Sequence, residues 1–271
     1  MDNYLDINRN SWNAKVEHHL KSDFYFVDEF LVGRTSLNSI ELEILGDVSG
    51  REILHLQCHF GQDSISLSRM GSKVTGVDLS DKAIDAARDL SAKTNSDARF
   101  VVSDIYALPE VLDKKFDIVY TSYGTIGWLP DLDKWAAVIS HFLKPGGKLV
   151  FVEFHPFIWM YDDDFSHVKY SYFNEEMIVE LEHGTYADQS ADLFQKSVTW
   201  NHPTSEVLTA LLKNGLQLSS FREYDWSPYP CFRHNEEFSP GRYRIPQFGN
   251  KVPHVFSLTA IKNCLQNEDS Y

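Results

Sequence analysis

Three residues in the first half of the chain stand where a nucleotide-type ligand could be bound. Gly61 lies in the turn after the apolar segment 51–56, and Asp78 and Asp104 each end a further apolar segment. In an open α/β sheet the ligand lies outside the carboxyl ends of the strands, where an acidic side chain can bind ribose hydroxyls. Asp78 follows the start of the turn by about twenty residues, as a ribose-binding acid does. Asp104 is placed to accept a hydrogen bond from an adenine amino group.

Each of these residues also has a purely structural interpretation. A lone glycine can serve only its turn, Asp78 can cap the helix that follows it, and Asp104 can close a surface turn. Their occurrence at three successive strand ends favours a bound ligand over three separate structural roles.

The segments that carry these residues predict a mostly parallel sheet with helices on both faces, because apolar strands alternate with helical patterns. A helical N-terminal segment from Asn8 to Leu45 precedes the first strand. The expected strands are 51–56, 73–78, 99–104, 116–121 and 148–154, and the expected helices between them are 63–70, 81–93 and 131–143.

The alternation stops after His155. Short β-like runs at 170–173 and 177–179 predict an inserted antiparallel unit. The remaining expected elements are a helix at 204–214 with Thr204 as its cap, and strands at 216–224 and 255–261 around an aromatic loop at 225–253.

Composition limits the partners and the compartment. The formal net charge of −14 is spread along 271 residues without a Lys/Arg-dominated block, so neither nucleic acid nor an anionic membrane surface is expected as a partner. Cys58, Cys231 and Cys264 have no CxxC spacing, which argues against a disulfide framework or a thiolate zinc site. The start of the chain is unlike a signal peptide, and no apolar run approaches the ~18 residues of a membrane span. We therefore expect a cytoplasmic monomer or homodimer.

No metal is expected. Asp162, Asp163 and Asp164 are consecutive, so their carboxylates point in different directions and lack the alternating spacing of a calcium loop.

The segments around Gly61, Asp78 and Asp104 resemble the class I S-adenosylmethionine-dependent methyltransferase family, of the bacterial small-molecule type. The resemblance covers about residues 50–155 and the final two strands. Residues 53–63 (ILHLQCHFGQD) stand at the first family motif, 77–80 (VDLS) at the second, 103–105 (SDI) at the third, 116–119 (FDIV) at the next strand, and 143–149 (LKPGGKL) at the following turn.

The first motif departs from the family pattern. His55 replaces the usual acid, and Gln57 and His59 replace the first two glycines, so only Gly61 remains. The family's methyl donor has no phosphate and does not need the cradle of backbone N–H groups that pyrophosphate requires. His59 or Gln62 is placed to contact the methionyl group instead.

The resemblance implies a seven-stranded Rossmann-like sheet with an antiparallel last strand in a single domain. It also implies S-adenosyl-L-methionine as donor and methyl transfer (EC 2.1.1.-) to a small-molecule acceptor that the sequence does not identify. The parts expected are an N-terminal helical cover (1–49), a cofactor-binding core (50–155), an inserted β unit (156–203), and a closing helix and hairpin (204–265). The implied cofactor-binding residues are Gln57, His59, Gly61, Gln62, Asp78, Leu79, Ser80, Asp104, Ile105, Ser122 and Tyr123.

Methyl transfer is an in-line displacement that depends mainly on positioning, and a general base is optional. His155, at the end of a strand, is the preferred base, although a histidine there can equally be a hydrogen-bonded structural group. Arg233, Arg242 and Arg244 would suit an acidic acceptor unless they are solvated. Two further functions remain open: a non-catalytic cofactor-binding protein, and a different enzyme on the same fold.

Overall fold

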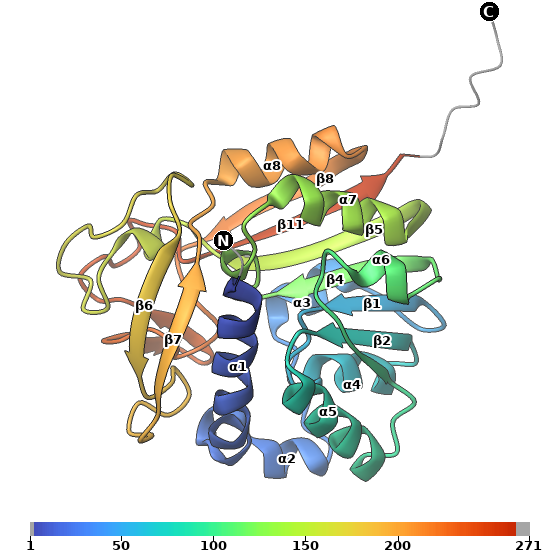
Figure 1. Ribbon diagram of the computed structural model, residues 1–271, viewed down its shortest axis with the longest axis horizontal. Helices are drawn as coiled ribbons and strands as arrows, with labels where there is room; N and C mark the ends of the chain where they lie inside the picture. Colours follow the sequence, from blue (N-terminus) through green and yellow to red (C-terminus); the bar gives the residue numbers. More distant parts are fainter. Residues whose placement is uncertain (1–2, 264–271) are drawn as a thin grey trace, which may run out of the picture.

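The computed structural model describes residues 3–263, which contain a seven-stranded sheet in the order β3-β2-β1-β4-β5-β11-β8 (Figure 1). The first five strands in this order, from β3 to β5, pair in parallel with one another, whereas β11 is antiparallel to both β5 and β8. This confirms the predicted sheet and its antiparallel last strand. The bounds are β1 (Glu52–Leu56), β2 (Lys73–Asp78), β3 (Arg99–Val102), β4 (Phe116–Ser122), β5 (Leu143–Phe154), β8 (Leu216–Tyr224) and β11 (Val255–Lys262).

Helices cover both faces of the sheet, as Figure 1 shows. Ile53 of β1 packs into a core with α3 and α4, whereas its neighbour Leu54 packs into the core beneath α7 and α8. Successive side chains of a strand point to opposite faces, so a strand with both faces covered is apolar throughout. The helices are α3 (Ser39–Leu45), α4 (Gln62–Arg69), α5 (Asp81–Lys93), α6 (Leu108–Val111), α7 (Leu132–Phe142) and α8 (Thr204–Lys213).

The N-terminal helix α1 (Tyr4–Lys21) lies between α5 and a hairpin formed by β6 (Ile178–His183) and β7 (Phe194–Thr199) (Figure 1). Asn8 exchanges two hydrogen bonds with the backbone of Val198, at 2.8 and 2.9 Å. Asn13 donates to Asp81 at 2.8 Å. These contacts fix α1 across the carboxyl edge of the sheet. The short helix α2 (Val27–Leu31) follows it.

The inserted unit differs from its prediction in detail. The run 170–173 is not a strand, because the backbone carbonyl of Ser171 is bound by the side chain of Asn201 at 2.7 Å and takes no part in a ladder. The hairpin partner of β6 is instead β7.

Two further differences follow from local contacts in the second half. Thr204 is the first residue of α8 rather than its cap, because its N–H is bound to the Tyr172 hydroxyl and Pro203 precedes the helix. The aromatic loop contains a small hairpin, β9 (Glu236–Ser239) and β10 (Arg242–Arg244), which was not predicted. Within residues 3–263 no helix is long and apolar enough to cross a membrane. Cys264 and the chain beyond it lie outside the described residues.

Candidate active site

A cavity of about 1630 Å³ lies at the carboxyl edge of the sheet, under α1. All but one of the implied cofactor residues line it, namely Gln57, His59, Gly61, Gln62, Asp78, Leu79, Asp104, Ile105, Ser122 and Tyr123. The exception is Ser80, whose hydroxyl caps α5 by accepting the Ala83 N–H at 3.0 Å and donates to Asn13 at 2.6 Å. The fold therefore brings residues from three strand ends and the loop after β4 to one space.

The loop between β1 and α4 has an unusual backbone. Gln57 and His59 have positive φ angles of 55° and 49°, and Gly61 has 79°. The residues that replace the family's glycines therefore still adopt a left-handed backbone conformation. For a residue with a Cβ atom this conformation costs roughly 1–2 kcal/mol. The Gln57 amide donates to Thr125 O at 2.8 Å and so helps to hold the loop.

Gly61 is required for packing as well as for its φ angle. A Cβ atom at this position would lie 2.6 Å from the Phe100 ring and 2.9 Å from Ala87. Any side chain would therefore push the loop away from β3 and α5.

Two side-chain atoms of the same loop are buried without a hydrogen-bond partner among the described residues. They are Gln57 Oε1 and His59 Nδ1. Most buried polar side-chain atoms have a partner, and an unpartnered one calls for an explanation. Since both residues line the cavity, a polar ligand at this loop would supply the missing partners.

Asp78 and Asp104 combine structural contacts with exposure to the cavity. Asp78 accepts the N–H groups of His59 and Ser80, both at 2.8 Å. Burial raises the pKa of Asp78 to about 6, against the lowering effect of these N–H groups. Asp104 accepts from the N–H groups of Tyr106 and Ala107 at 3.1 and 3.2 Å. Asp104 therefore closes a turn, as its structural interpretation expected, whereas α5 is capped by Ser80 and not by Asp78. Both carboxylates also line the cavity.

The helix α1 covers the cavity with aromatic and basic side chains. The Trp12 ring lies edge-on to His59 and to Trp128, with centroids 5.2 Å apart in each case. Lys15 is buried, lies 5.1 Å from the Trp12 ring and pairs with Glu182 at 3.0 Å. The sequence analysis did not select Lys15. Its signal is the helical spacing of Asn8, Trp12 and Lys15, which places one face of α1 over the cavity.

A pair of histidines joins α1 to the loop. His19 Nδ1 and His59 Nε2 are 2.9 Å apart. Burial, Lys15 and neighbouring histidines lower both pKa values, that of His19 to about 3. Both rings are therefore neutral at physiological pH and share one proton in their contact.

Two carboxylates that the sequence analysis did not select lie near Tyr123. Asp63 accepts from the Tyr120 and Ser122 hydroxyls at 3.3 Å each. Glu41 accepts from the Tyr123 hydroxyl at 2.7 Å and from the Asn38 N–H at 2.7 Å. Burial and Asp63 raise the pKa of Glu41 to about 7. Asp63 could have been found because it ends the quoted first motif, whereas Glu41 carries only the signature of a helix cap.

Glu153 fixes the segment after β4. It accepts hydrogen bonds from the Thr125 N–H and hydroxyl and from the N–H groups of Gly124, Ile126 and Phe154. Burial raises its pKa and these donors oppose the effect. A single buried carboxylate thus orients the segment that also receives Gln57.

His155 is not a cavity residue. Its Nδ1 accepts the Phe157 N–H at 3.1 Å, so Nε2 carries the proton and donates to Glu223 at 2.9 Å. Burial lowers its pKa. Both ring nitrogens are used within the protein, so the geometry supports the structural interpretation rather than a general base.

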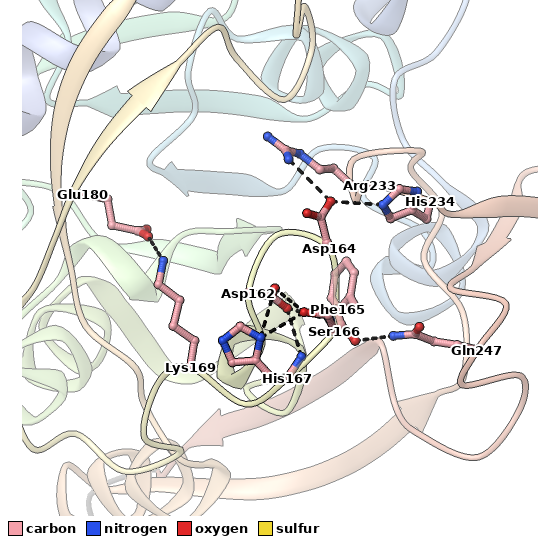
Figure 2. Close-up of polar contacts among 10 residues, drawn as sticks. All are labelled: Asp162, Asp164, Phe165, Ser166, His167, Lys169, Glu180, Arg233, His234 and Gln247. Carbon is pink, nitrogen blue, oxygen red and sulfur yellow. Dashed lines mark hydrogen bonds and ion pairs between the residues drawn. The ribbon is translucent and has the colours of Figure 1, made fainter.

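The segment after β5 contacts the aromatic loop 225–253, as Figure 2 shows. We call these two segments the roof of the cavity, which they line through Asp163, Phe165, Tyr229 and Arg233. Asp164 lies 3.6 Å from Arg233 and 3.1 Å from His234, and Gln247 donates to Phe165 O. Asp162 points elsewhere and accepts from Ser166 and His167. Arg233 is therefore occupied by aspartates of the roof.

Comparisons with known proteins agree with this arrangement. Residues 53–147 match the model of a methyltransferase domain. A ubiquinone biosynthesis O-methyltransferase from Coxiella burnetii is 32% identical over 45% of this chain and 50% of its own length. A sterol 4-C-methyltransferase from Caenorhabditis elegans is 26% identical over 50% of this chain and 42% of its own length. The chain thus spans about half the length of the curated relatives it matches.

Solved structures agree at the level of the fold. The crystal structure of an S-adenosylmethionine-dependent methyltransferase from Mesorhizobium loti is similar with a TM-score of 0.53 at 18% identity, covering 85% of this chain and 99% of that one. The resemblance found in the sequence is confirmed. Residues 53–147 match a methyltransferase domain, and the chain has the fold of the solved S-adenosylmethionine-dependent methyltransferases to which it is similar.

Proposed function

We propose that the chain is an S-adenosylmethionine-dependent methyltransferase that acts on a small-molecule acceptor. The observation that carries the proposal is the convergence of Asp78, Asp104 and the loop 57–62 on one cavity. These residues lie at the carboxyl ends of β1, β2 and β3 in an open α/β sheet, which is where such sheets bind nucleotides.

The residues present fit this donor. Asp78 would bind the ribose hydroxyls and Asp104 the adenine amino group, with the apolar side chains of Leu79 and Ile105 beside the adenine. The unpartnered atoms Gln57 Oε1 and His59 Nδ1 would meet the polar methionyl end. The first motif, although its sequence has changed, therefore keeps positive φ angles at Gln57 and His59 and offers polar side-chain atoms to a ligand.

When bound, the donor supplies an electrophilic methyl group on a sulfonium. The chain's own contribution is to hold an acceptor beside it and to exclude water. Tyr123 and Ser122 line the cavity between the donor residues and the roof. No nitrogen of His155 is free for an acceptor proton, so we place no base there.

The alternative of a non-catalytic binding protein came from the altered first motif. That motif retains the left-handed backbone at Gln57 and His59, so the alteration gives no specific support to a loss of activity. The names of the curated relatives include both an O- and a C-methyltransferase, so they do not define the accepting atom here.

The proposal also includes the division of the chain, its location in the cell and its oligomeric state. We keep the division into a cover (1–49), a core (50–155), an insert (156–203) and a closing part (204–265). Cysteine usage supports a cytoplasmic location. A monomer or homodimer is expected, and light scattering would measure which.

Calorimetric titration with S-adenosylmethionine and S-adenosylhomocysteine tests the function. We expect micromolar binding by wild type and at least tenfold weaker binding by Asp78→Ala, a loss of about 1.4 kcal/mol. Asp85→Ala on the exposed face of α5 is the control and should bind as wild type does. Folded wild-type protein that binds neither ligand would contradict the proposal.

A further inference from the structure

The cavity carries an excess of negative charge. Ten carboxylate side chains line it, against three lysine and arginine side chains. Each basic group is already in an ion pair: Lys15 with Glu182 at 3.0 Å, Arg34 with Glu29 at 2.5 Å, and Arg233 with Asp163 and Asp164 at 3.6 Å. The described lining therefore offers no unpaired basic side chain to an anionic acceptor.

Two carboxylates near Tyr123, those of Asp63 and Glu41, have no basic side chain paired with them. Neither Asp63 nor Glu41 lies within ion-pair distance of a lysine or arginine among residues 3–263. Asp63 lines the cavity, and its donors are uncharged hydroxyls, those of Tyr120 and Ser122 at 3.3 Å and that of Ser36. A carboxylate removed from water without a countercharge is costly, so a bound cation would be stabilised at this place.

Aromatic rings surround the same place. Tyr229 lies edge-on to Tyr123 with centroids 5.0 Å apart, and Phe24 stacks on Tyr229 at 5.7 Å. The Asn38 side chain joins Tyr229 to Glu41, with hydrogen bonds of 2.8 and 3.0 Å. Aromatic faces attract cations through the ring quadrupole, and the attraction grows when water is excluded.

We propose that the methyl acceptor is an organic amine that enters as its cation and binds at Asp63, beside the contacting rings of Tyr123 and Tyr229. This proposal rests on the methyltransferase function and adds the class of its substrate. It disfavours the acidic acceptor that Arg233, Arg242 and Arg244 suggested in the sequence. Besides the pairing of Arg233, Arg244 is bound to Asp225, and Arg242 lies 4.6 Å from the Trp226 ring.

The transfer balances with these groups. The ammonium gives one proton to the Asp63 carboxylate, which frees a nitrogen lone pair. That lone pair forms the N–C bond to the methyl group while the S–C bond of the sulfonium breaks and sulfur keeps its electron pair. The proton later leaves Asp63 to water.

The methionyl ammonium of the donor is a competing occupant of Asp63. The experiment therefore uses protein saturated with S-adenosylhomocysteine, whose own ammonium fills any site reserved for it. Benzylamine, benzyl alcohol and benzoate are then titrated at neutral pH as probes of nearly equal size that are cationic, neutral and anionic. We expect benzylamine to bind at least tenfold more tightly than either of the others.

Variants of Asp63 and Asp163 test where the preference for benzylamine arises. Asp63→Asn should reduce the benzylamine preference over benzyl alcohol to less than threefold. Asp163→Asn is the matched control, because Asp163 also lines the cavity but is 74% exposed in its side chain, and the preference should stay within twofold of wild type. If Asp63→Asn does not fold, Tyr229→Leu should lower the preference through loss of the aromatic face.

The outcomes separate the two proposals. Absence of S-adenosylhomocysteine binding would reject the methyltransferase function itself. Normal binding of S-adenosylhomocysteine would leave that function standing. With it, equal affinity for the three probes, a preference for benzoate, no benzylamine binding, or a preference unchanged by Asp63→Asn would overturn the amine proposal.

Discussion

The two ends of the cavity are built in different ways. The donor end consists of residues at the carboxyl ends of β1, β2 and β3: the loop 57–62, Asp78 and Asp104. The acceptor end is assembled from distant segments, including the N-terminal residues 24–41, Tyr123 and the roof around Tyr229. The sheet places the strand ends of the donor end, whereas packing among loops positions the acceptor end.

This difference indicates which part of the cavity can change its specificity for the acceptor. Parallel strands in one sheet bring their carboxyl ends to one edge whatever the loops contain. Loops and the β6–β7 hairpin can vary without disturbing that edge. Such a division allows the acceptor end to change while the donor end keeps its geometry.

The largest effect should come from Glu153, which fixes the segment after β4 and lines the cavity. Glu153→Gln replaces one acceptor oxygen by an amide that cannot accept the N–H groups of Thr125 and Ile126. Because these buried donors lose their partner, we expect the free energy of unfolding to fall by about 3 kcal/mol or more. Urea unfolding measures it, with the exposed Asp133→Asn as control. A loss below about 1 kcal/mol would show that Glu153 does not fix this segment.

A smaller effect should appear where α1 contacts the donor loop. His19 is fully buried with a pKa of about 3, so the unfolded chain takes up its proton first, near pH 6.5. Stability from the neutral ring is complete above pH 6.5 and is lost as pH falls. Relative to His19→Phe, wild type should lose about 2 kcal/mol between pH 6.5 and 5. Protonation of buried acids changes the free energy of unfolding of wild type and of His19→Phe alike. Parallel stability profiles of the two proteins against pH would therefore refute the prediction.

His155 lies outside both ends, and its replacement should affect folding but not binding. His155→Gln should lower the free energy of unfolding by about 1–2 kcal/mol through loss of its contacts with Phe157 and Glu223. Affinity for S-adenosylhomocysteine should stay within twofold of wild type. If affinity for S-adenosylhomocysteine fell tenfold while the free energy of unfolding stayed unchanged, His155 would have to be part of the binding site.

The smallest effect tests the backbone of the donor loop. Gln57→Gly and Gln57→Ala both remove the hydrogen bond to Thr125, so they form a matched pair. At a φ of 55° only glycine is unstrained, and the alanine variant should be less stable by about 1 kcal/mol. Thermal or urea unfolding of both variants is the measurement. Equal stabilities would mean that the loop adopts another conformation.

The same difference explains what could be predicted from the sequence. The sheet strands and the cofactor residues at their ends follow from apolar segments, turns and motif spacing, and only Ser80 among those residues faces away from the cavity. Lys15 and Glu41 could not be assigned, because their place depends on how α1 and α3 pack. His155 was selected by its position after β5, but side-chain direction and its bond to Glu223 are not visible in a sequence.

A crystal structure of the chain with S-adenosylhomocysteine tests the central claim most directly. We predict the ribose hydroxyls at Asp78, the adenine amino group at Asp104, and the methionyl end against Gln57 and His59. Ligand density elsewhere, or an empty cavity in crystals grown at saturating ligand, would contradict the assignment of the donor end.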